Sequence, residues 1–99
     1  MKKIQKMVDQ IDDELNGAME YMECALDFKA HGDGSWYQKF RSMAEQELSH
    51  SSILHDRAVE EIDLLSKVYT PPVEMEEKWN AAHKKYVEKA AWVRTMLQM

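Results

Sequence analysis

The chain is organised around the stretch Met43-Ala-Glu-Gln-Glu47-Leu-Ser-His50-Ser-Ser-Ile-Leu-His55. At about 100° per residue, this stretch and its flanks place one apolar stripe along an α-helix. The stripe consists of Phe40, Ala44, Ser51, Leu54, Ala58, Ile62 and Leu65. Glu47 falls in the middle of this stripe. An ionised carboxylate that faces a core is strongly disfavoured, so Glu47 needs a partner that neutralises it.

His50 follows Glu47 by three residues, about 60° round the same helix. A Glu and a His at this spacing can reach one point, which is how a helix offers two ligands to a metal ion. The spacing also arises by chance. The alternative is a partly exposed Glu47 at a loose helical seam, with His50 an ordinary flanking residue.

The composition restricts the possible classes of protein. The 99 residues make a single domain, 1–99. The composition favours an all-α globule, because 44% of the residues are hydrophobic, 31% are charged, and there are only three glycines and two prolines. A net charge of −5 and dispersed basic residues argue against nucleic-acid binding. Cys24 stands alone, which excludes an internal disulfide and favours a cytoplasmic location. We also expect no membrane association, because no apolar run has the length of a signal core or a bilayer span.

Apolar residues at spacings of 3 and 4 predict three helices, over residues 4–30, about 35–67 and about 72–97. Gly32 is expected to end the first helix, and Ser35 with Gln38 resembles a capping box for the second. Thr70 is the expected cap of the third helix, which Pro72 would begin. The short first loop predicts an antiparallel hairpin of two long helices, to which the third helix is added.

On the first helix, Glu14 borders the apolar face, whereas Glu20 and Glu23 point away from it. Tyr21 lies one heptad after Glu14 on the same flank. Taken singly, Glu14 could be a solvated flanking residue and Tyr21 a half-buried packing residue.

Together these residues resemble the first helical hairpin of the ferritin-like superfamily, rubrerythrins in particular. The resemblance covers residues 11 to about 58 without a gap, and Glu47 follows Glu14 by 33 positions. The residues that carry it are Glu14, Tyr21, Gly32, Phe40, Ala44, Glu47 and His50. The resemblance implies that Glu14, Glu47 and His50 are metal ligands and that Tyr21 lies beside them as a hydrogen-bonding residue. Carboxylates with one imidazole per metal suit iron or manganese better than a structural zinc.

The third helix departs from the family pattern, because Asn80 stands three residues before His83 where a second Glu would be needed, and there is no fourth helix. One chain would therefore supply half of a di-metal site. The resemblance to half-length members, such as the encapsulated ferritins, implies a homodimer that completes a four-helix bundle. The implied activity is iron oxidation, as a ferroxidase, or peroxide detoxification. Trp92 and Met96 fall off the apolar face of the third helix. Trp92 is therefore a candidate for a further subunit contact in a higher oligomer, with an isolated surface aromatic as the alternative. The third helix could also contact a shell or another partner protein.

An alternative from another class of protein stays open. The chain could be a metal-free helical interaction or structural module, with Glu47 neutralised by a basic residue or by a proton. His55 is interpreted as a surface or interface histidine, and His83 as a hydrogen-bonded histidine of the core.

Overall fold

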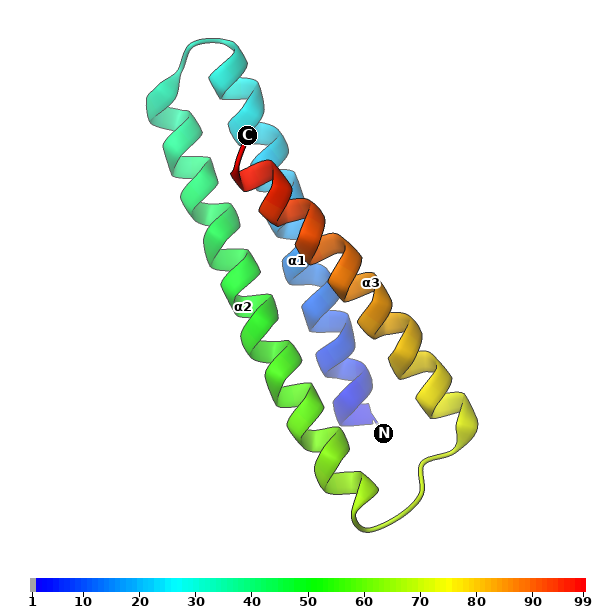
Figure 1. The fold of residues 1–99 in the computed structure, drawn as a ribbon. Coiled ribbons are helices and arrows are strands. Elements are labelled where there is room, and N and C mark those ends of the chain that lie inside the picture. The colour runs from blue at the N-terminus through cyan, green and yellow to red at the C-terminus, as the bar shows by residue number, and fades with distance from the viewer. Residues whose placement is uncertain (1) are drawn as a thin grey trace.

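The computed structural model describes residues 2–99 and contains three helices, α1 (Lys2–Ala30), α2 (Gly34–Ser66) and α3 (Val73–Leu97). Figure 1 shows α1 and α2 as a long antiparallel hairpin, with α3 returning alongside it, in an elongated molecule of 56 × 19 × 17 Å. The bounds lie within two residues of those predicted, and the all-α class is confirmed. None of the three helices combines the length and the apolar character that a bilayer crossing requires.

The turn between α1 and α2 is built by two residues. Gly32 adopts a φ of 78°, the left-handed conformation that a glycine takes without strain at the end of a helix. The Asp33 carboxylate then accepts a hydrogen bond from the backbone N–H of Trp36 at 3.1 Å. The predicted capping box of Ser35 and Gln38 was therefore wrong. Asp33 is an equally good cap and lies two residues before Ser35, so the helix begins at Gly34.

The prediction that Thr70 caps α3 was also wrong. Pro72 occupies the N-cap position, and no side chain caps the helix. A capping side chain must reach the second or third helical N–H, and Thr70 lies two residues too early to do so.

Small residues line the seam of the hairpin. Ala18, Ala44, Ser51 and Ala58 have no exposed surface, so the two backbones approach closely along this line. The buried Ser51 hydroxyl donates to the backbone carbonyl of Leu48 at 2.7 Å and leaves no unpaired polar group. The buried apolar residues form two clusters, one of Ile11, Leu15, Ala58 and Ala90 and the other of Met22, Ala25, Ala44 and Met96.

The C-terminal half of α3 closes over the hairpin. Lys89 donates to Asp12 at 2.7 Å and to Asn16 at 2.8 Å, both on α1. Arg41 on α2 donates to the terminal carbonyl of Leu97 at 2.8 Å. Met96 is buried, with 5% of its surface exposed, so the prediction that it lies off the apolar face was wrong. Trp92 is 45% exposed, as predicted.

Candidate metal centre

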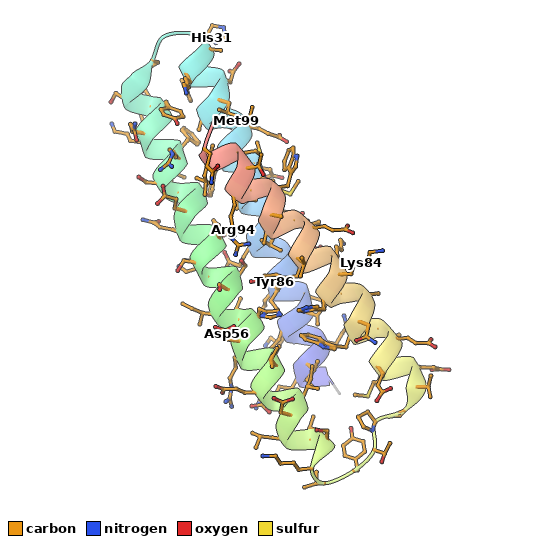
Figure 2. All side chains as sticks on the ribbon, in the orientation of Figure 1. His31, Asp56, Lys84, Tyr86, Arg94 and Met99 are labelled. Atoms are coloured by element: carbon orange, nitrogen blue, oxygen red, sulfur yellow. The ribbon has the colours of Figure 1, made fainter. Side chains whose placement is uncertain are left out.

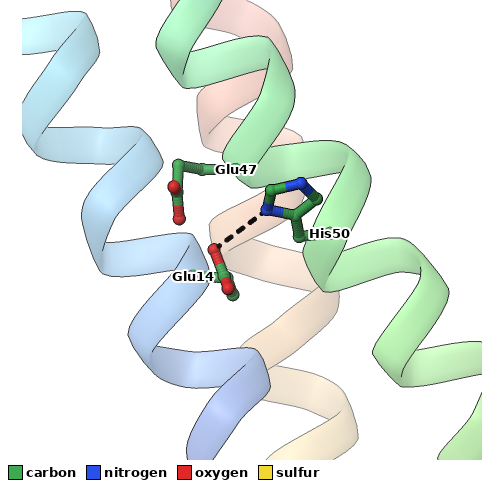
Figure 3. Close-up of side chains that lie close together, drawn as sticks. All are labelled: Glu14, Glu47 and His50. Atoms are coloured by element: carbon green, nitrogen blue, oxygen red, sulfur yellow. Dashed lines mark ion pairs between the residues drawn. The ribbon is translucent and has the colours of Figure 1, made fainter.

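The three predicted ligands come from the two helices of the hairpin. Glu14 projects from α1, and Glu47 and His50 project from successive turns of α2. One ligand atom from each of the three lies within 4.8 Å of the other two. Figure 3 shows the two carboxylates and the imidazole turned toward one another across the seam. The structure therefore brings together all three residues on which the sequence-based hypothesis depends.

The triad lies on the side of the hairpin that α3 leaves uncovered. On α1, Asp12, which binds Lys89 of α3, is about 160° round the helix from Glu14. On α2, His55, which contacts α3, is about 140° from His50. Figure 3 accordingly shows α3 behind the hairpin and the three side chains in front of it.

The triad is accessible from solvent on this open side. His50 Nδ1 lies 3.6 Å from Glu14 Oε2, and the two side chains are 55% and 28% exposed. An ion pair at this exposure contributes little to stability, on the order of 0–1 kcal/mol. An ion from solvent can therefore reach the three side chains without any opening of the core.

Glu47 is half-buried and lies directly over Gly17 of α1. A Cβ atom at position 17 would lie 3.3 Å from Glu47 Oε2, closer than ordinary van der Waals contact. The missing side chain therefore leaves the space that the carboxylate occupies. Sequence reasoning did not single out Gly17. The available signal was a glycine inside a long helix, where it costs about 1 kcal/mol relative to alanine.

The electrostatics of the triad disfavour two free negative charges. A hydrogen bond with Glu14, partial burial and the Glu14 charge raise the pKa of Glu47, and His50 opposes that rise. A raised pKa of one carboxylate beside another means that a proton or a cation between them is favoured. A proton or a cation bound there would be the neutralising partner that the sequence predicts for Glu47.

Tyr21 lies on the same helix as Glu14 and is half-buried. Its ring contacts Phe40 of α2, with ring centroids 6.1 Å apart. The contact adds Tyr21 to the packing beside the triad, and its hydrogen-bonding role stays a prediction.

His55 and His83 are placed differently from their interpretation. The side chain of His55 is only 15% exposed, and its Nε2 lies 3.0 Å from Nδ1 of His83, which is itself exposed rather than in the core. The interpretation of His83 as a hydrogen-bonding residue agrees with this contact, but sequence reasoning identified no partner with which it could form a ligand pair. The partner belongs to another helix, so no spacing along the chain could have identified it.

No family model matches the chain, and neither a curated protein nor a solved structure is significantly similar to it. The resemblance to ferritin-like proteins therefore stays a prediction.

The donor set fits a metal ion of the iron or manganese type. Two carboxylates supply hard oxygen ligands and the imidazole supplies a nitrogen ligand. Ligands of one ion lie at most about 4.4 Å apart, twice a metal–ligand distance of about 2.2 Å. Because the atoms already lie within 4.8 Å of one another, small side-chain rotations would bring them to that range.

Proposed function

We propose that this chain is a metal-binding protein of the di-metal carboxylate class, acting on iron or manganese through Glu14, Glu47 and His50. The convergence of these three side chains from two helices, with ligand atoms within 4.8 Å, is the observation that carries the proposal. The glycine under Glu47 and the raised pKa of its carboxylate both support it.

A single chain supplies three ligands, too few for two metal ions. Two copies that meet across the open side of the hairpin would supply four carboxylates and two imidazoles. That is the ligand composition of the ferritin-like di-metal bundles, with two-fold symmetry in place of an internal repeat. We therefore propose a homodimer in which two hairpins form one four-helix bundle.

Exposed apolar side chains on α2 support this interface. Ile53 is 64% exposed and lies one turn after His50, and Leu64 is 54% exposed and lies on the same face three turns later. Trp36, 47% exposed, lies on the face of Glu47. Burying such side chains against a second copy would contribute roughly 1.5–3 kcal/mol each if burial were complete.

The residues of the triad have separate tasks in this proposal. Glu14 and Glu47 would neutralise the positive charge of the ion, which also relieves their mutual repulsion. His50 would add a neutral ligand, and its exposed edge leaves a route for iron and for a small oxidant. Bound ferrous iron would supply the electrons for reduction of dioxygen or peroxide.

The proposal is tested by the metal content of purified protein grown with excess iron or manganese. We expect at least one ion per chain in the wild type and less than a tenth of that in Glu47→Ala and His50→Ala. Glu23→Ala and His31→Ala are matched controls, because both wild-type residues are exposed and far from the triad in sequence; they should retain the metal. A wild-type chain free of metal after both growth conditions would contradict the proposal.

Activity is measured separately, as oxidation of added ferrous iron by dioxygen or peroxide. The rate above the protein-free background should fall at least tenfold in Glu14→Ala and remain unchanged in Glu23→Ala. If the wild-type protein binds iron but oxidises it no faster than the background, the proposed catalytic activity is wrong and only metal binding remains.

A metal-free interaction module is the second candidate function. The observation that favours it is the proximity of the Glu14 and Glu47 carboxylates, whose oxygens lie within 4.8 Å of each other, because a shared proton can also neutralise them. Bound metal in the wild-type protein, lost in the triad variants, would exclude this candidate.

A further inference from the structure

A second pair of potential ligands lies on the opposite side of the molecule from the triad. His55 of α2 and His83 of α3 face each other with Nε2 and Nδ1 3.0 Å apart. The two imidazoles come from different helices, and they meet where the first half of α3 passes α2.

The surroundings hold the His55 ring in one orientation. The ring stacks on Tyr86, with centroids 4.2 Å apart and planes 8° from parallel, and Trp79 lies 6.1 Å away. On the other edge, Nδ1 of His55 lies 3.6 Å from a carboxylate oxygen of Asp56. A carboxylate beside one imidazole nitrogen favours a proton there and leaves the other nitrogen free as a ligand. In His55 that other nitrogen is the one that faces His83.

Both imidazoles also line a cavity of about 800 Å³ between the three helices. Its walls are mainly apolar, with Ile11 and Leu15 from α1, Leu65 from α2 and Trp79 from α3. Figure 2 shows Tyr86 in this region, between α3 and the hairpin. An ion held by the two histidines would therefore have its remaining coordination positions open to water in the cavity.

We propose that His55 and His83 form a second metal site, which takes Cu²⁺ and links α2 to α3. Two nitrogens 3.0 Å apart, each about 2.0–2.1 Å from one ion, subtend about 91–97° at it. That is the angle between adjacent ligands in a tetragonal complex, the geometry of Cu²⁺, which also binds nitrogen ligands most tightly among the divalent first-row metals. Among residues 2–99 no third His, Cys, Asp or Glu joins the pair in a ligand group, so the affinity should be moderate.

The site is tested by titrating Cu²⁺ into the full chain carrying Trp36→Phe and Trp92→Phe, which leaves Trp79 as the only tryptophan. The Trp79 ring lies 5.9 Å from His83, so paramagnetic copper at the pair should quench its fluorescence. We expect saturable quenching of Trp79, with a Kd at least tenfold weaker in His83→Ala. For electron paramagnetic resonance, Glu47→Ala and His50→Ala are added to both proteins so that the triad no longer takes copper. The spectrum should then show two nitrogen ligands when His83 is present and at most one in His83→Ala.

Controls separate this pair from the triad. His50→Ala and Glu47→Ala should leave the Kd for Trp79 quenching unchanged, and so should His31→Ala, which removes an exposed histidine elsewhere. His83 is exposed, so its replacement should not prevent folding, which circular dichroism checks; His55→Gln gives a second, independent loss. Equal Kd values for Trp79 quenching in His83→Ala and the parent, or a loss of that quenching in His50→Ala, would overturn the proposal.

Discussion

Glu47 stands between Ala44 and Ser51, two residues of α2 with no exposed surface. Its carboxylate fits this position because Gly17 leaves space beneath it; His50 beside it favours the charged form and Glu14 disfavours it. Each of these neighbours has a measurable effect on stability or on metal affinity.

Glu47→Gln should stabilise the metal-free protein at neutral pH. The Glu14 hydrogen bond, partial burial and the Glu14 charge raise the pKa of Glu47 above its ordinary 4.5. A raised folded-state pKa means that stability falls as the pH rises from about 4.5 through the folded-state pKa, and that the loss persists at pH 7. The glutamine amide does not ionise, so the variant avoids this loss of stability. We expect its free energy of unfolding to be higher by about 0.5 kcal/mol, a small value because the group is in contact with solvent.

Urea denaturation in the presence of a chelator measures this gain. The free energy of unfolding of the variant should exceed that of the wild type at pH 7. The two values should converge at about pH 3, where the carboxyl group is protonated in both states. Excess Mn²⁺ should reverse the order, since an ion at 100 times its Kd stabilises the wild type by about 2.7 kcal/mol. A difference that does not change with pH would contradict the electrostatic explanation.

Gly17→Ala should separate stability from metal binding. Alanine has a higher helix propensity than glycine, which stabilises the helix by up to about 1 kcal/mol. Its Cβ atom would lie 3.3 Å from Glu47 Oε2, at the flexible end of a side chain that can move away. The displaced Glu47 should then bind Mn²⁺ at least tenfold more weakly in a calorimetric titration. Unchanged Mn²⁺ affinity in a stable variant would show that the space over Gly17 has no part in the site.

Glu47 and His50 could be predicted from the sequence, because Glu47 interrupts an apolar stripe and His50 follows at metal-ligand spacing. Glu14 could be predicted only from its position on the core side of its helix, 33 residues before Glu47. The His55–His83 contact could not be predicted, since it depends on how α3 lies across the hairpin.

At the scale of the helices, α3 is attached mainly through its C-terminal half. Partial burial raises the pKa of Asp12, but Lys89 and Lys85 outweigh this effect and hold the pKa below its ordinary value of 3.8. The folded state therefore gains stability above about pH 3.8, and this gain disappears as the pH falls through the lowered pKa.

Lys89→Met should destabilise the protein by about 1 kcal/mol at pH 7, because the methionine keeps the apolar stem but loses the bonds to Asp12 and Asn16. Thermal or urea unfolding measures the change, and Lys84→Met, which alters an exposed lysine of the same helix, is the matched control. The difference from the wild type should shrink below pH 3.8. An effect no larger than that of the control would show that these bonds do not hold α3.

The helices themselves were predictable because their apolar residues recur at spacings of 3 and 4. The caps were not, since Asp33 and Ser35 are both good capping residues and only the course of the loop selects between them. The burial of Met96 was missed because it depends on both hairpin helices, which enclose the end of α3 through Met22, Ala25 and Ala44.

At the scale of the whole molecule, the open side of the hairpin predicts a dimer. In the presence of Mn²⁺, light scattering should give twice the 11.6 kDa chain mass, and Ile53→Lys should shift the protein to monomer at micromolar concentration. Val87→Lys is the control, because Val87 is an exposed apolar residue of α3. Equal masses of the two variants would place the contact elsewhere.

Anomalous diffraction from crystals of the manganese-loaded or iron-loaded protein tests the central claim most directly. We expect a metal peak within bonding distance, about 2.0–2.3 Å, of Glu14, Glu47 and His50, with the triad of a second copy completing the site across a two-fold axis. Crystals whose metal peaks all lie away from these three side chains, or that contain no peak, would contradict it.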